Sequence, residues 1–299
     1  MFPENREKQV MKAALRKSLD SPVRSFVVQE LTAPHFDPNW HFHPQYQLFT
    51  VLEGTGTRFI GDHIRPFAPG DTVFMAPNLP HLWRSDQAYF ESDSRLNTHG
   101  LVVYFTEDFL GEGFFDKPEM APLRRLFTEG QRGLEVPAES QFEVQHHLRG
   151  LLRATGFDAV LRLLHLLHDL AQRADLRPIA SVGYANTHKT SETERMQRVY
   201  EYAMSQFRGE VHLEEAASRA GMSPAAFCRY FKARTNKTFT GFVSEIRIGH
   251  ACKLLQEPAL SVNQVAYESG FNTLSNFNRQ FREVTGQTPV AYRKAYGKG

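Results

Sequence analysis

Two similar stretches decide the fold of the C-terminal part of the chain: residues 217–232 read ASRAGMSPAAFCRYFK, and residues 266–282 read AYESGFNTLSNFNRQFR. Their glycines, Gly221 and Gly270, are 49 residues apart, and the second copy has one extra residue after its glycine. Repetition at a period of about fifty residues indicates one supersecondary unit used twice. We therefore expect two copies of one helical unit.

Each copy is predicted to be a short helix, a turn and a second helix. Apolar residues recur at helical spacing in 213–220 and 262–269, and the glycine that follows can adopt the left-handed conformation that ends a helix. Ser223 and Asn272 are expected to cap the second helix of each copy. Between the copies, residues 241–256 predict one connecting helix, roughly 24 Å long.

The second helix of each copy is predicted to read DNA. Phenylalanines at i, i+4 face inward, and an exposed arginine on a short helix after a glycine turn suits the major groove. Two such helices about 34 Å apart would reach successive major grooves. The outward residues expected to bind DNA are Ala225, Cys228, Arg229 and Lys232 in the first copy and Ser275, Asn278, Arg279 and Arg282 in the second.

The charge distribution agrees with a nucleic-acid partner. The 299 residues are 41% hydrophobic and 23% charged, which excludes the membrane and disordered classes. The formal net charge of +2 is the sum of −3 over residues 1–189 and +5 over residues 190–299. Residues 218–299 alone carry a net charge of +8. The chain therefore joins a mildly acidic module to a basic one.

The basic module resembles the DNA-binding domain of the AraC/XylS family of bacterial transcription regulators, over residues 194–296. The resemblance implies double-stranded promoter DNA as a partner, and RNA polymerase as a second partner of an activator. By resemblance, the expected base contacts come from Ala225, Ala226, Cys228 and Arg229, then Ser275, Asn276 and Arg279. Ala225 and Ala226 replace larger side chains of the family, so the first helix is expected to contribute mainly Arg229 and small apolar contacts. The matching residues of the second copy are Ala266, Ser269, Gly270, Phe271, Phe277, Arg279, Phe281, Gly286, Pro289, Tyr292 and Arg293.

Residues 26–106 are predicted to form short antiparallel strands after a polar helix at 4–19. β-Branched and aromatic runs are separated by turns rich in Gly, Pro and Asp, a pattern that favours a small barrel or jelly roll. The expected strands include 45–53, 57–60, 63–67, 72–75 and 101–105.

A histidine motif resembles that of the cupin superfamily. His41, His43 and Gln47 have even spacing, which places them on one face of a strand, and His81 follows on a later strand. In metal-binding cupins three histidines and a glutamate hold a divalent ion. Gln47 stands at the glutamate position, and an amide oxygen is a weak ligand for transition metals. His41, His43 and His81 are therefore candidate ligands of zinc or nickel, or else hydrogen-bonding groups within the barrel or toward an effector.

The same part of the chain is expected to bind a small-molecule effector. Ligand sites in barrel mouths combine aromatic walls with a few polar groups, and Trp40 and Tyr46 could also stack on a sugar-like ligand. A sugar is one candidate by resemblance, since many regulators of this family sense sugars. The expected effector-binding residues are His41, His43, Gln47, Arg58, His81 and Trp83.

The predicted architecture is α+β with two domains. Residues 1–179 form an antiparallel β-barrel of the cupin or jelly-roll type with flanking helices, 180–193 a linker, and 194–299 an all-α domain with tandem helix-turn-helix motifs. Helices are expected at 122–129, 141–154 and 158–173. The last carries a stripe that suits packing on its own domain or a homodimer seam, formed by Leu161, Leu164, His165, Leu167, His168 and Ala171.

Two classes of function are open. The first is a transcription regulator that senses an effector; the second is a metal-dependent cupin enzyme with an accessory DNA-binding domain. Gln47 and the lack of an acid/base pair count against the enzyme, so we expect no catalytic residues. Residues 1–227 contain no cysteine, which sets aside an alkylation-repair protein with the same DNA module.

The expected location is the cytoplasm. Cys228 and Cys252 are too few for a disulfide framework and are expected to be reduced. No segment has the apolar core of a signal peptide or the length of a membrane helix, so no membrane partner is expected.

Overall fold

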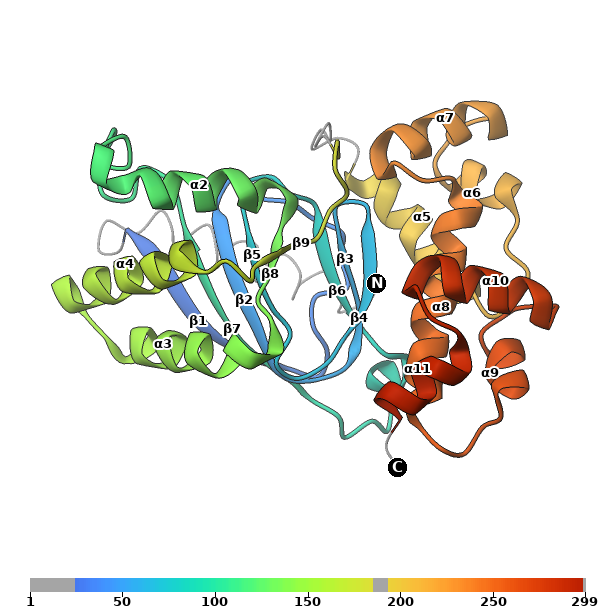
Figure 1. Ribbon diagram of the computed structural model, residues 1–299. Helices are drawn as coiled ribbons and strands as arrows, with labels where there is room; N and C mark the ends of the chain where they lie inside the picture. The colour runs from blue at the N-terminus through green and yellow to red at the C-terminus, as the bar shows by residue number, and fades with distance from the viewer. Residues whose placement is uncertain (1–24, 185–192, 298–299) are drawn as a thin grey trace.

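The structure is a computed structural model that describes residues 25–184 and 193–297. Two β-sheets lie at the centre of the molecule, with one group of helices on each side (Figure 1). The helix expected at 4–19 lies outside the described residues, as does 185–192 of the expected linker.

The strands pair into two antiparallel sheets. Residues from both sheets interdigitate in one apolar cluster, so the sheets pack face to face as a sandwich. Within the described residues no strand ladder joins the two sheets, so the structure does not show the closed barrel expected from the sequence. The larger sheet has the order β1 (Phe26–Ala33), β7 (Thr98–Phe105), β2 (Tyr46–Glu53), β5 (Thr72–Met75), β8 (Leu134–Glu135), β9 (Arg177–Pro178), and the smaller has β4 (His63–Phe67), β3 (Gly56–Ile60), β6 (His81–Ser85).

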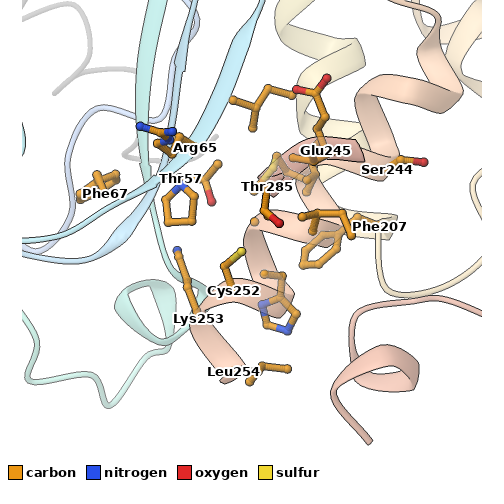
Figure 2. Close-up of a pocket in the computed structure, with 18 of the residues that line it drawn as sticks. Thr57, Arg65, Phe67, Phe207, Ser244, Glu245, Cys252, Lys253, Leu254 and Thr285 are labelled. Carbon is orange, nitrogen blue, oxygen red and sulfur yellow. The ribbon is translucent and has the colours of Figure 1, made fainter. Parts of the chain in front are cut away.

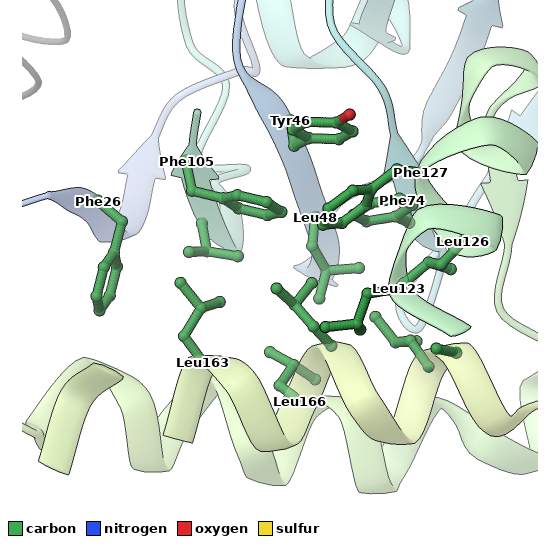
Figure 3. Packing of buried hydrophobic residues seen from close by; sticks show 14 of the residues in the cluster. Phe26, Tyr46, Leu48, Phe74, Phe105, Leu123, Leu126, Phe127, Leu163 and Leu166 are labelled. Atoms are coloured by element: carbon green, nitrogen blue, oxygen red, sulfur yellow. The ribbon is translucent and has the colours of Figure 1, made fainter. Parts of the chain in front are cut away.

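Three helices cover the outer face of the larger sheet: α2 (Ala121–Glu129), α3 (Gln141–Arg153) and α4 (Gly156–Gln172). Figure 3 shows leucines of α2 and α4 pointing at the aromatic side chains of the sheet. Leu163 and Leu166 of α4 are buried there with Tyr46 and Phe105. The helix α4 therefore packs on its own domain, but through a different face from the predicted stripe: Leu167 and Ala171 are buried, whereas Leu161, His165 and His168 of that stripe are exposed.

Short 3-10 turns connect several of these elements: η1 (Gln87–Phe90), η2 (Pro118–Met120), η3 (Gly130–Arg132) and η4 (Ala138–Ser140). The C-terminal part is helical throughout its described residues and has two cores. The connecting helix α8 contributes to both, its first half to one and its second half to the other. The helices are α5 (Thr193–Gln206), α6 (Leu213–Arg219), α7 (Pro224–Thr235), α8 (Phe239–Gln256), α9 (Val262–Glu268), α10 (Leu274–Thr285) and α11 (Pro289–Tyr296).

The two sequence copies fold alike, with one difference at the second helix. Gly221 and Gly270 both have positive φ, at 66° and 84°, as the turn requires. Ser223 caps α7 by accepting a hydrogen bond from the Ala226 N–H, as expected. The cap predicted at Asn272 is wrong: Thr273 caps α10, because the extra residue after Gly270 moves the helix start one position along the chain.

The outer face of the smaller sheet packs directly on the helical part. Phe59 of β3 contacts Tyr200 of α5 and Phe242 of α8, with ring centroids 5.5 and 5.9 Å apart. Ile64 and Leu82 join the same buried cluster. The sandwich and the first helical unit therefore share one hydrophobic core, and β4 lies against α8 (Figure 1).

Candidate nucleic-acid interface and histidine cluster

The helix α7 presents a polar face that its phenylalanines fix in place. Phe227 and Phe231 are fully buried, and their rings pack at 5.5 Å. The opposite face is exposed because a helix that buries positions i and i+4 turns the intervening side chains outward. Of the predicted DNA-binding residues, Ala226 is half-buried and the others are exposed, namely Ala225, Cys228, Arg229 and Lys232.

The helix α10 repeats this arrangement. Phe277 and Phe281 are fully buried, with ring centroids 5.5 Å apart. Asn276 is half-buried, and the other predicted residues of this helix are exposed: Ser275, Asn278, Arg279 and Arg282. Both helices therefore offer an accessible arginine at the same position of the repeat, Arg229 and Arg279.

The two arginines differ in what holds them. Arg279 donates to Glu283 Oε1 at 2.8 Å and to Asn276 Oδ1 at 2.9 Å, and the Gln280 side chain also donates to Asn276 Oδ1. The equivalent positions of α7, Ala226 and Ala233, carry no polar side chain. Sequence reasoning missed Glu283, although its i, i+4 spacing from Arg279 is the usual signal for an ion pair on a helix.

The three histidines of the sandwich converge. One ring nitrogen from each of His41, His43 and His81 lies within 4.8 Å of the others. His41 and His81 are joined by two backbone hydrogen bonds of 3.2 and 2.9 Å. The expectation that 41, 43 and 47 share one strand is wrong, because β2 begins only at Tyr46. Pro44 follows His43 and lacks the N–H that a continuous strand would need.

Each imidazole of the cluster has one nitrogen next to an oxygen. His41 Nδ1 is 2.7 Å from Asn39 O, His81 Nδ1 is 2.7 Å from Leu79 O, and His43 Nε2 is 2.8 Å from Gln47 Oε1. Donation to these oxygens places the proton there and the lone pair on the other nitrogen of each ring. Such partners orient histidines that bind metals.

Two atoms of the cluster are buried without a protein partner: His43 Nδ1 and His81 Nε2. Burial, reinforced by the neighbouring His41, lowers the pKa of His43 to about 4. Burial and the two other histidines hold the pKa of His81 well below its usual range. Both rings are therefore neutral at pH 7, which is the form that coordinates a cation.

The cluster fits a zinc or nickel ion although Gln47 replaces the glutamate of metal-binding cupins, because three ring nitrogens converge and the rings of His43 and His81 are neutral at pH 7. Gln47 is buried and its Oε1 is engaged by His43, so its role is to orient that ring. Three histidine nitrogens with a fourth position for water or a ligand suit tetrahedral zinc.

Arg58 and Trp83 are committed to a buried ion network in the sandwich. Arg58 is 1% exposed and pairs with Asp71 at 2.7 Å and also with Glu135. Trp83 Nε1 donates to the other oxygen of Asp71 at 3.2 Å. The sequence did not indicate Asp71 or Glu135, because these partners come from distant segments.

The two other aromatic residues proposed to stack on a ligand lie elsewhere. Tyr46 packs against Phe105 and Phe127 on the outer side of the larger sheet, and its hydroxyl donates to Glu107 at 3.1 Å. Trp40 is 1% exposed and packs against Tyr200 of α5, with ring centroids 4.5 Å apart. These two expectations were wrong because β2 directs Tyr46 away from the interior and the helical part covers Trp40.

Trp40 links the cluster to the helical part of the molecule. It directly precedes His41, and its backbone N–H donates to Gln197 Oε1 of α5. The side-chain amide of Gln197 also donates to Pro38 O at 3.3 Å. The loop that supplies two of the histidines is therefore held on its other side by α5.

Comparison with protein families finds two matches. A helix-turn-helix domain model matches residues 216–295, and a cupin domain model matches residues 28–88. The first region contains the exposed faces of α7 and α10, and the second contains the histidine cluster. Within residues 25–184 and 193–297, no helix combines the length and apolarity needed to cross a membrane.

Two similar curated proteins are named as transcriptional regulators. The chain is 34% identical over 100 residues to the uncharacterized HTH-type transcriptional regulator YdeC of Bacillus subtilis, which is 33% of this chain and 34% of YdeC. It is 26% identical over 247 residues to the HTH-type transcriptional regulator MtrA of Neisseria gonorrhoeae, covering 78% of this chain and 80% of MtrA. The chain thus spans about a third of the length of YdeC and most of MtrA.

Among solved structures, one similar chain is the DNA-binding domain of AdpA in complex with a target DNA. It is 30% identical, and the match covers 34% of this chain and 93% of that chain at a TM-score of 0.33.

Proposed function

Because the chain is a DNA-binding transcriptional regulator of the AraC/XylS family with an N-terminal cupin domain, we propose that it reads promoter DNA with two helices under control of its histidine cluster. In this proposal α7 and α10 enter successive major grooves on one side of the duplex. The cupin domain binds the controlling ligand and has no catalytic role. The observation that carries the proposal is the hydrophobic core that the cupin domain shares with the first helical unit.

Arg229 and Arg279 supply the base readout. A guanidinium that donates to O6 and N7 of guanine is the commonest specific contact in the major groove. Exposed lysine and arginine side chains on the same helices, Lys232 and Arg282, contact phosphates and set the register.

The histidine cluster binds a divalent metal, zinc or nickel, through His41, His43 and His81. Three observations support this: one ring nitrogen of each histidine converges on the same point, the rings of His43 and His81 are neutral, and an oxygen atom orients each ring. Arg58 and Trp83 are occupied by Asp71, so the cluster itself, with Gln47 beside it, is the effector contact that we favour over a sugar stacked in the sandwich.

Ligand binding is transmitted through Trp40. A ligand that moves His41 also moves Trp40, whose ring packs on Tyr200 and whose N–H is held by Gln197. Since α5 belongs to the first helical unit, its displacement changes the position of α7 relative to α10. Such a change gives the two ligands a coupling free energy.

A homodimer is proposed through the exposed side of α3 and α4. The leucines Leu163, Leu166, Leu167 and Leu170 of α4 are buried within the domain, and other apolar side chains remain on the surface: Phe142 of α3 is 78% exposed and Phe157 of α4 is 73% exposed. Leu161 lies one turn from Phe157 on α4 and is 43% exposed. Large exposed apolar side chains mark interaction surfaces.

The DNA proposal is tested by selecting genomic fragments that bind the full chain and measuring affinity at several salt concentrations. We expect steep salt dependence and loss of discrimination between selected and random fragments in Arg229→Ala and Arg279→Ala. Lys117→Ala, an exposed change outside α3, α4 and the helical part, is the control and should bind as the native chain does. Equal affinity of the native chain for selected and random fragments would contradict the proposal.

The sensor proposal is tested by titrating Zn²⁺ and Ni²⁺ into the full chain. We expect His43→Gln to weaken metal binding at least tenfold and to remove any effect of metal on DNA affinity, whereas His99→Gln, on β7 outside the cluster, changes neither. Turnover of a substrate that depends on the bound metal would favour the cupin-enzyme alternative instead.

A further inference from the structure

A cavity of about 1540 Å³ lies between the smaller sheet and the helical part of the molecule (Figure 2). In the sheet, Phe59 and its cross-strand partners pack directly on α5 and α8. Two residues along β3, Thr57 is paired with Pro66 and Arg84, and this row lines the cavity. The domains are therefore in contact at one end of the sheet and separated at the other.

The second half of α8 forms the facing wall. At Gly249 the helix passes close to the sheet, since a Cβ there would lie 3.6 Å from Pro66 Cδ. Beyond it, Cys252 and Lys253 border the open space, and Figure 2 shows both on the side of α8 that faces the strands. Lys253 Nζ reaches across to Asp86 Oδ1, 2.6 Å away, and so bridges the two walls.

The interior of the sandwich offers no comparable space near its aromatic cluster, because that region is filled. Phe36, Phe49 and Trp83 pack there with ring centroids 5.4 and 4.8 Å apart. Small-molecule sites enclose about 300–1,000 Å³. The cavity between the domains is large enough for a small organic ligand together with water.

The charges that line the cavity favour an anion. Seven Arg and Lys side chains line it against five Asp and Glu side chains. Three of its cations are neutralised at short distance: Lys253 by Asp86 and Lys237 by Glu245 at 2.6 Å, and Arg279 by Glu283 at 2.8 Å. Arg65 has only a long 3.4 Å contact with Glu135.

Arg84 is the cation best placed for a ligand. One face of its guanidinium lies 5.1 Å from the centroid of Phe90, which leaves the N–H groups at its edge for hydrogen bonds. No Asp or Glu in the described ranges forms an ion pair with it, although Glu201 contributes a favourable field. A partly buried guanidinium of this kind binds carboxylate or phosphate through two parallel N–H donors.

A polar atom without a partner adds a second indication. His63 Nδ1 is buried, makes no hydrogen bond, and belongs to a residue that lines the same cavity. Less polar groups complete the lining, including Phe207, which directly follows α5, and Cys252. Burial raises the pKa of Cys252 to about 11, so its thiol is neutral at pH 7.

We propose that this cavity is a second ligand site, separate from the histidine cluster, which takes a small organic anion with an apolar body. The anionic group, a carboxylate or a phosphate ester, binds Arg84 and Arg65, and the apolar body lies between Pro66 and the second half of α8. The helix α8 forms one wall of the cavity, so a bound ligand fixes the angle between α8 and the smaller sheet. Because α8 also joins the two helical units, this angle affects the positions of α7 and α10.

The test is calorimetric titration of the full chain with three probes that share one ring: benzoate, phenyl phosphate and benzyl alcohol. We expect at least one anion to bind tenfold or more tightly than the alcohol, and the tighter anion identifies the natural headgroup as carboxylate or phosphate. Equal binding of all three probes, or no binding, overturns the proposal.

Variants locate the bound probe. Arg84→Gln and Arg65→Gln should each weaken the anion at least tenfold with an unchanged melting temperature; Arg65 is 56% exposed, so its replacement does not threaten the fold. Lys117→Gln, an exposed cation that does not line the cavity, is the charge-matched control. Wild-type affinity in both arginine variants overturns the site.

His43→Gln separates this site from the sensor proposal. The variant should bind the anion as the native chain does, whether or not the histidine cluster binds metal. Loss of the anion in this variant would place the probe in the histidine cluster and overturn the proposal.

Discussion

The Arg279 side chain makes hydrogen bonds within its own helix, and in the proposed complex these bonds compete with those that it makes to DNA. Its contact with Glu283 joins two side chains that are each about 60% exposed, so the pair contributes only about 0.2–1 kcal/mol. The contact with Asn276 fixes the orientation of the guanidinium along the helix. In the proposed complex, Glu283 therefore competes weakly with a guanine for Arg279 and adds a negative charge near the DNA phosphates.

Replacing Glu283 tests that competition. Glu283→Gln should tighten binding of a selected DNA fragment by roughly two- to fivefold, because the ion pair is removed and one negative charge leaves the interface. Fluorescence anisotropy at several salt concentrations measures the change. Glu268→Gln, an exposed change of the same charge on α9, is the control. An equal gain in the control would mean that net charge alone is responsible.

His63 predicts a pH dependence of stability. Burial, together with the positive charges of Arg58, Arg65 and Lys237, lowers its pKa to about 3. The unfolded chain takes up the proton near pH 6.5 and the folded chain does not, so the free energy of unfolding falls as the pH decreases from 7 toward 3.

Urea unfolding at pH 7 and pH 5 measures this effect. The contribution of His63 between these values is at most about 2 kcal/mol, and His63→Gln should flatten the decline by up to that amount. His212→Gln is the matched control, since its side chain is 64% exposed. A variant that loses stability as steeply as the native chain would show that other groups cause the decline.

At the scale of elements, the two glycine turns have the same backbone and different surroundings. A Cβ on Gly221 would meet nothing within 4 Å, whereas a Cβ on Gly270 would lie 2.4 Å from Phe207 O and 2.9 Å from Arg247 Nε. The second turn is packed against the end of α5, and the first is open to solvent.

The matched pair Gly221→Ala and Gly270→Ala separates backbone strain from packing. Gly221→Ala should cost about 1–2 kcal/mol, the strain of a left-handed alanine. Gly270→Ala should cost at least about 3 kcal/mol, because a backbone oxygen must also move. Chemical denaturation of both variants measures the difference. Equal costs would show that the contact with Phe207 relaxes freely.

Sequence patterns predicted most elements because each depends on local chemistry. Alternating apolar residues and Gly or Pro turns gave β4 and β5 with their observed ends, and helical periodicity gave α3 and α4 to within two residues. Asn272 was a wrong cap because Ser, Thr, Asn and Asp all cap well, so adjacent candidates cannot be ranked by type.

At the scale of the whole molecule, the least predictable feature is the contact between the domains. Trp40 and Tyr200 are 160 residues apart, and no periodicity connects them. The histidine cluster was predictable as a set of residues, but its position beside α5 was not. The partners of Arg58 could not be predicted either, since Asp71 lies in the turn before β5 and Glu135 lies on β8.

Gln197 provides a test of transmission between the domains. Gln197→Leu keeps the size of the side chain and removes both hydrogen bonds to the 38–40 loop. We expect the effect of Zn²⁺ on DNA affinity to fall at least threefold while the metal affinity is unchanged, since the cluster ligands stay in place. Glu194→Leu on the exposed side of α5 is the control. An undiminished effect of zinc would exclude this route.

The division of α8 between two cores has a consequence for how such a protein diversifies. Phe242 and Ile246 belong to the core shared with the cupin domain, whereas Ile248 and Leu255 belong to the second unit. The boundary between the two cores therefore lies near Arg247, within α8. In the proposed binding mode, exchange of residues 248–297 between relatives would replace one of the two DNA-reading helices. The core that the cupin domain shares with the first half of α8 would stay intact, whereas the contacts of Gly249 and Lys253 with the cupin domain would be exchanged as well.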